Sequence, residues 1–114
     1  MEKRKRRELL EAYRERKTVG GIYAVRNRRN GKLLVGSAAD LRGIRNRFEF
    51  AKRTGSGLSL KLKRDWETFG PEAFELEILE ELEKKDAQTA EEFAADLRAL
   101  LEMKLEGMNP GTLY

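Results

Sequence analysis

The sequence contains no cysteine and no histidine among its 114 residues. Without cysteine the chain cannot form disulfides or thiolate zinc sites, and without histidine it has no imidazole base and no Ser-His-Asp triad. It also lacks an apolar run close to the length of a membrane span, and it lacks the apolar core of a signal peptide. We therefore expect a soluble, cytoplasmic protein without a membrane partner.

Charged residues, in contrast, are abundant and unevenly distributed. Residues 1–64 carry 20 Lys and Arg against 6 Asp and Glu, a net charge of +14, whereas residues 65–114 carry 4 against 14, a net charge of −10. A strongly basic half is typical of a surface that faces a polyanion. The alternative is that the basic and acidic halves attract each other within the fold.

The length suits one domain, which we place at residues 19–114, preceded by a basic helix at residues 1–18. In that first segment Leu9, Leu10 and Tyr13 have the spacing of a narrow apolar stripe, so we expect the helix to pack on the domain. The basic run at residues 3–7 is either a nucleic-acid contact or a solvated terminus.

Two short apolar runs at residues 22–25 and 33–35 flank the pair Asn30-Gly31. Asn and Gly accept positive φ at low cost, so this pattern predicts a β-hairpin with a tight turn. Later in the chain, apolar and glutamate residues alternate from Phe74 to Glu80, which predicts a third strand with one solvated face.

The remaining segments show helical spacing. Asp40 is a predicted N-cap for a helix that ends near Arg53, and Ser59 for a second helix that ends at Gly70-Pro71. A third helix is predicted from about Thr89 to Gly107. The fold class is therefore α+β, with a small three-stranded antiparallel sheet flanked by helices.

Several motifs in this order resemble the GIY-YIG nuclease family. Gly-Ile-Tyr at residues 21–23 and Leu-Val-Gly-Ser-Ala at residues 34–38 resemble the two strand motifs that give the family its name. The resemblance extends over roughly residues 19–110 and includes the segments 30–32, 40–41, 62–66, 69–74 and 75–80. It implies a fold of the GIY-YIG type.

The resemblance also implies an activity, the metal-dependent cleavage of phosphodiester bonds. The family site combines a metal-binding glutamate on a helix, an arginine that clamps the phosphate, a tyrosine from each strand motif and often a histidine. Tyr23 matches the first tyrosine. Apolar residues stand at the positions of the second tyrosine, the arginine, the histidine and the glutamate, which are Leu34, Ile44, Phe48 and Leu101. We expect these four to fill the former cleft with packed apolar surface.

Polar residues next to those positions allow a rearranged site. A register slip of one residue would place Arg45 at the arginine position and Glu49 one helical turn later, and Glu102 follows the glutamate position directly. An active enzyme would then use Tyr23, Arg45 and Glu49 as catalytic residues and Glu102 as a ligand of Mg²⁺ or Mn²⁺. Without activity, no cofactor is expected.

The sequence therefore predicts a GIY-YIG-like domain that binds nucleic acid, and DNA in particular, through its basic half, with a degenerate, weakly active or inactive cleavage site. The two alternatives are the active metal-dependent endonuclease just described and a protein-interaction module whose basic face meets an acidic partner. The candidate phosphate contacts are Arg26, Arg28, Lys32, Arg45, Arg47, Lys61 and Arg64.

Overall fold

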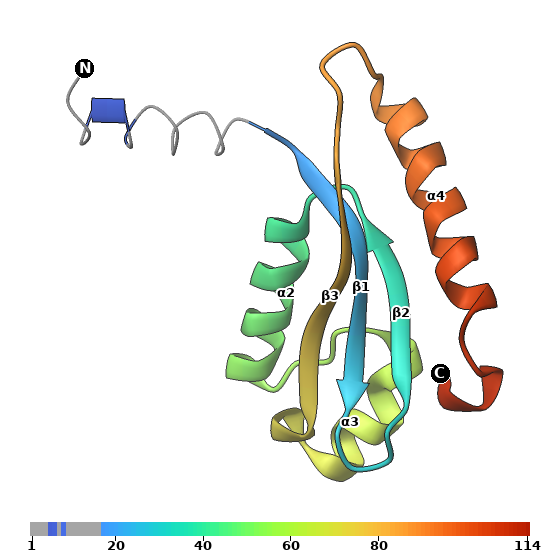
Figure 1. The fold of residues 1–114 in the computed structure, drawn as a ribbon. Helices are drawn as coiled ribbons and strands as arrows, with labels where there is room; N and C mark the ends of the chain where they lie inside the picture. Colours follow the sequence, from blue (N-terminus) through green and yellow to red (C-terminus); the bar gives the residue numbers. More distant parts are fainter. Residues whose placement is uncertain (1–4, 7, 9–16) are drawn as a thin grey trace.

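The computed structural model describes residues 5, 6, 8 and 17–114, and its centre is a three-stranded antiparallel sheet (Figure 1). Strands β1 (Val19–Asn27) and β2 (Leu33–Ala38) form the predicted hairpin, in which Tyr23 pairs with Gly36. Strand β3 (Phe74–Glu83) pairs with the other edge of β1, so the strand order is β2-β1-β3. The predicted α+β class is confirmed.

The hairpin turn is wider than the tight Asn-Gly turn that the sequence predicts. Five residues, 28–32, separate the two strands. A two-residue type I′ turn requires positive φ at both central residues, and in this loop only Gly31 has one, at 77°. Asn30 stabilises the loop with its side chain instead: its Oδ1 accepts a hydrogen bond from the amide of Lys32 at 2.9 Å. The wider loop therefore replaces the predicted turn.

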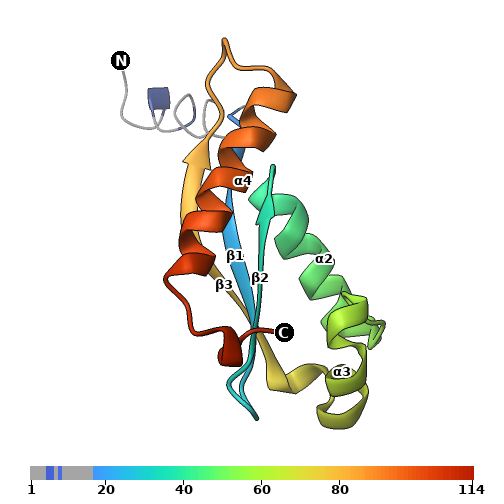
Figure 2. The same ribbon diagram turned by 90° about the vertical axis from the view of Figure 1, so that its right-hand side faces the viewer.

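Helices cover both faces of the sheet, and they do so in two separate layers (Figures 1 and 2). One face carries helix α2 (Leu41–Thr54), the 3₁₀ turn η1 (Leu60–Leu62) and helix α3 (Lys63–Phe69). The opposite face carries helix α4 (Ala90–Glu106). Two shorter 3₁₀ turns, η2 (Pro71–Ala73) and η3 (Pro110–Thr112), precede β3 and follow α4.

The helices begin where side chains cap them. The Asp40 carboxylate accepts a hydrogen bond from the amide of Arg42 at 2.9 Å, which lowers the pKa of Asp40 and starts α2 as predicted. Ser59 caps η1 in the same way through the amide of Lys61. Thr89 and Glu92 form a reciprocal capping box at the start of α4.

The larger core lies between the sheet and the layer of α2, η1 and α3. Trp66 packs on Phe74 with ring centroids 4.8 Å apart, and its indole Nε1 donates a hydrogen bond to the carbonyl of Gly55 at 3.2 Å. On the other face, Phe93 and Leu97 of α4 are buried. The predicted helical stripes therefore do face the sheet, but from opposite sides.

The predicted N-terminal helix lies mostly outside the described residues. Of that segment the structure describes Lys5, Arg6 and Glu8, which are helical and exposed, and also Lys17 and Thr18. The Nζ of Lys17 lies 2.7 Å from Glu83 Oε1. The packing of residues 1–18 on the domain stays a prediction. Across the described part of the chain, none of the helices is long and apolar enough to cross a membrane.

Candidate nucleic-acid interface

A shallow pocket of about 370 Å³ opens beside the hairpin, on the face that α2 and η1 cover. We call it the cleft. Tyr23 and Leu34 line it from the two strands, and Ile44 and Arg47 from α2. Residues 58–59 line it from the loop that leads into η1, and residues 60–61 from η1 itself. Two of the predicted phosphate contacts, Arg47 and Lys61, thus meet at the tyrosine of the first strand motif.

The position of Tyr23 depends on the glycine opposite it. A Cβ atom at Gly36 would lie 2.7 Å from the hydroxyl oxygen of Tyr23 and 2.8 Å from its Cζ, closer than atoms can pack. The tyrosine ring therefore lies directly against the backbone of β2, where any other residue would displace it. This close approach explains why the second strand motif has a glycine at position 36.

The apolar residues at the family positions fill only part of the cleft. Ile44 is 3% exposed and Phe48 is 6% exposed, so both belong to the core. Leu34 is half-buried and packs against the same core. Leu101 does not join them, because it lies on α4, which covers the opposite face of the sheet (Figure 2). Of the expected cluster of four, only Leu34 and Ile44 therefore line the cleft, while Phe48 lies in the core outside its lining.

The polar residues of the rearranged site are also spread out. Arg45 lines a different depression, together with Lys17 and Asp40 at the start of α2. Glu49 is exposed on α2 and does not line the cleft, and Glu102 is exposed on α4 behind the sheet. The structure thus brings Tyr23 together with Arg47 rather than with these three.

Ion pairs between β1 and β3 use part of the basic half. Arg26 donates from Nε to Glu77 Oε1 at 2.7 Å and from Nη2 to Glu77 Oε2 at 3.1 Å, a bidentate pair. This pair raises the pKa of Arg26 and lowers the pKa of Glu77. Arg28 lies 3.9 Å from Glu75. Residues of the basic and acidic halves therefore do form ion pairs with each other where β1 pairs with β3.

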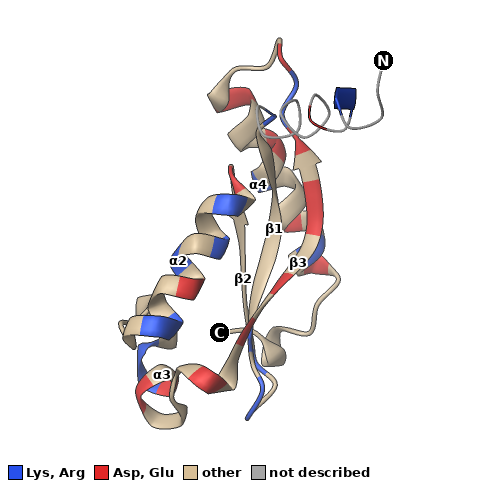
Figure 3. Cartoon of the chain, turned by 90° about the vertical axis from the view of Figure 1, so that its left-hand side faces the viewer, with Lys and Arg blue, Asp and Glu red and all other residues tan. Residues whose placement is uncertain are grey.

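A second group of cations has no such partner. Within the described residues, no ion pair is formed by five cations of α2, η1 and α3: Arg45, Arg47, Lys61, Lys63 and Arg64. In Figure 3 the basic positions follow α2 and the start of α3, whereas acidic positions follow β3. We call Arg47, Lys61 and Lys63 the basic rim.

Two features were missed by the sequence analysis. Lys63 was not among the candidate contacts, although it lines the pocket over Trp66 next to the cleft. The second is a polar network in which Tyr114 donates to Asp65 Oδ2 at 2.7 Å and accepts from Asn27 Nδ2 at 2.9 Å. Only the fold reveals that network, because its members are far apart in the sequence.

Taken together, the antiparallel sheet and the helices on its two faces define a small α+β domain with a tyrosine in its cleft. Neither a scan against protein-family models nor a search of curated proteins finds a match. A search of solved structures finds the catalytic domain of the homing endonuclease I-TevI, at 32% identity over 71% of this chain and 87% of that chain, with a TM-score of 0.47. A Glu-to-Ala variant of that catalytic domain matches at 32% identity, over 80% and 92% of the two chains, with a TM-score of 0.46. The chain belongs to the GIY-YIG nuclease family.

Members of this family are generally metal-dependent, but the described lining of the cleft offers no side chain that would hold a metal ion. The lining of the cleft contains no carboxylate and no imidazole. Over the described part of the chain, no group of three or more Asp and Glu residues is placed to hold a metal ion. Glu102, the candidate ligand, lies behind the sheet. We therefore derive no step through a metal.

Proposed function

We propose that this domain binds nucleic acid through the cleft and its basic rim and that it cleaves phosphodiester bonds weakly or not at all. The observation that carries the proposal is the meeting of Tyr23, Arg47 and Lys61 in one open cleft without an acidic partner. Cations without ion pairs are free to neutralise phosphates, and they supply most of the affinity in sequence-independent binding.

The pairing of charges supports this reading over simple attraction between the two halves. If the basic half served only the fold, its cations would pair with the acidic residues. The ones on β1 do, as Arg26 shows with Glu77. Those of the basic rim do not, and because the chain belongs to a nuclease family, nucleic acid is the polyanion that they fit best.

The composition of the cleft supports weak or absent cleavage. Phosphodiester hydrolysis needs a base for the water and preorganised charge around the phosphate, and losing one such group costs about 10² to 10⁴ in rate. The cleft offers cations and a tyrosine but no group that could act as a carboxylate or imidazole base. Its residues can hold a phosphate and orient it.

The binding test uses fluorescence anisotropy of a labelled DNA duplex over a series of salt concentrations. The parent should bind with a log affinity that falls linearly with log salt, by about 0.9 for each phosphate neutralised. Arg47→Glu combined with Lys61→Glu should weaken binding strongly. It should also reduce the steepness of log affinity against log salt by about 2. The matched control is Lys85→Glu with Arg98→Glu, which makes the same charge change outside the cleft.

Equal loss in both double variants would mean that net charge, and not the cleft, governs binding. No binding by the parent even at low salt would contradict the proposal and favour an acidic protein partner. In the same samples, incubation of plasmid and single-stranded DNA with Mg²⁺ or Mn²⁺ should leave both intact. Nicking that chelator and Glu102→Ala abolish would support the rearranged active enzyme instead.

A further inference from the structure

Leu60 is the most exposed large apolar residue that the structure describes, with 89% of its surface accessible. It lies on η1, between the half-buried Leu58 and the fully buried Leu62. A single exposed leucine is ordinary in a soluble protein. The position of this one is unusual, because it stands on a fixed turn next to the cleft.

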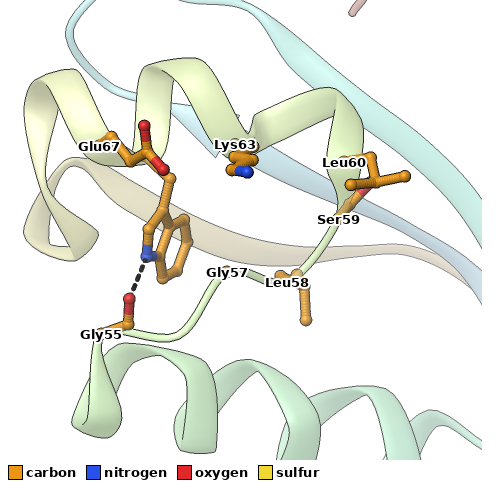
Figure 4. Close-up of a pocket in the computed structure, with 8 residues that line it drawn as sticks. Gly55, Gly57, Leu58, Ser59, Leu60, Lys63 and Glu67 are labelled. Carbon is orange, nitrogen blue, oxygen red and sulfur yellow. Dashed lines mark hydrogen bonds between the residues drawn. The ribbon is translucent and has the colours of Figure 1, made fainter.

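The turn that carries Leu60 is held from both sides. The hydroxyl of Ser59 accepts from the amide of Lys61 at 3.3 Å, and the amide of Leu62 donates to the carbonyl of Ser59 at 3.1 Å. Leu62 anchors the turn in the core. Figure 4 shows the Leu60 side chain at the start of this turn, directed away from Lys63 and Glu67.

Leu60 also stands between two hollows that cations border. On one side is the cleft, with Arg47 and Lys61. On the other side is a pocket of about 430 Å³ beside Trp66, with Lys63 in its wall. Leu60 lines both. A duplex held by the basic rim would therefore meet an apolar side chain in the middle of its contact surface.

We infer that Leu60 inserts between neighbouring base pairs of the bound duplex, so that the domain selects DNA with a weakened base step, such as a mismatch. This inference rests on the proposed function. Proteins that bend DNA use apolar wedges in this way, at the cost of unstacking a step. Unstacking costs least at a mismatch, so a protein that must unstack a step favours mismatched duplexes.

The test compares two labelled duplexes that differ only in one central mismatch, with 2-aminopurine next to it to report unstacking. The parent should bind the mismatched duplex about tenfold more tightly and raise the 2-aminopurine fluorescence. Leu60→Ala should bind both duplexes equally, at the affinity of the parent for the paired duplex and with an unchanged salt slope. Leu60→Met should restore the preference.

The control is Met103→Ala, which removes a 68% exposed apolar side chain from α4, on the other face of the sheet. It should behave as the parent. A parent that binds both duplexes equally would overturn the role of Leu60 and leave the proposed function standing. A Leu60→Ala variant that keeps the preference and the fluorescence change would do the same. A parent that binds neither duplex would overturn both.

Discussion

At the scale of single residues, the cleft depends on a contact that involves no charge. Gly36 lets the ring of Tyr23 lie against β2. A methyl group added at Gly36 would lie 2.7 Å from the hydroxyl oxygen of Tyr23 and 2.8 Å from its Cζ. Gly43 makes a useful comparison, because it lies inside α2 and a Cβ there would meet nothing within 4 Å. The same substitution should therefore have opposite effects at the two positions.

We expect Gly36→Ala to lower the free energy of unfolding by about 1–3 kcal/mol, because the tyrosine ring must move out of its place. Gly43→Ala should raise it by about 0.5–1 kcal/mol, because alanine is the better helix former. Urea unfolding measures both. Large shifts of the Tyr23 ring protons in NMR spectra should accompany the first change only, and unchanged shifts there would contradict this account of the glycine.

Asp65 and Tyr114 provide a pH-dependent contribution to stability. The hydrogen bond from Tyr114 lowers the pKa of Asp65 below 3.8, and burial together with Asp65 raises the pKa of Tyr114 above 10.0. A lowered carboxyl pKa stabilises the fold above 3.8, and that contribution disappears as pH falls through the folded-state value. A raised tyrosine pKa stabilises the fold below 10.0, and that contribution disappears as pH rises through the folded-state value.

Tyr114→Phe should therefore melt at a lower temperature than the parent throughout the neutral range. The difference between the two melting temperatures should be constant at intermediate pH and should narrow below pH 3.8 and above pH 10.0. Thermal melts over a pH series measure it. A difference that does not change with pH would mean that Tyr114 stabilises the fold by packing alone.

At the scale of elements, the two helices that carry the family positions differ in their tolerance of charge. Ile44 on α2 is 3% exposed, whereas Leu101 on α4 is half-buried at the other face of the sheet. Ile44→Arg should cost about 2–5 kcal/mol, because an unpaired charge replaces a core side chain. Leu101→Glu should cost about 1 kcal/mol, since only part of an apolar side chain is lost. Urea unfolding of both variants measures these losses of unfolding free energy. Equal losses would contradict the separation of the two layers.

The elements themselves were largely predictable from the sequence. Alternation in β3 and the capping position of Asp40 are local signals, and the structure confirms both. The face that α4 covers was not predictable, because an apolar stripe fixes which side of a helix is buried but not which layer buries it. Because α4 covers the opposite face of the sheet, Leu101 is separated from Ile44. The expectation that Leu101 helps to fill the cleft was wrong for the same reason.

The candidate site was predictable only in its parts. Tyr23 came from its motif, and Arg47 and Lys61 from the basic composition. The cations that pair internally could not be separated from those that do not, because Arg26 meets Glu77 through the register of β1 against β3, which no local pattern contains. Lys63 was missed for a related reason, since its place beside Trp66 depends on how α3 packs.

At the scale of the whole molecule, the pairing of β1 with β3 leaves the charge separated between two sides. Unpaired cations remain on the layer of α2, η1 and α3, whereas half of the acidic residues of the sequence lie on β3 and α4 (Figure 3). We expect this charge distribution to give the protein a permanent dipole moment. In the field of a polyanion it experiences a torque that turns the cleft forward before contact, while the acidic side is repelled. Added salt should then slow association more than it speeds dissociation, because screening removes the torque at long range first.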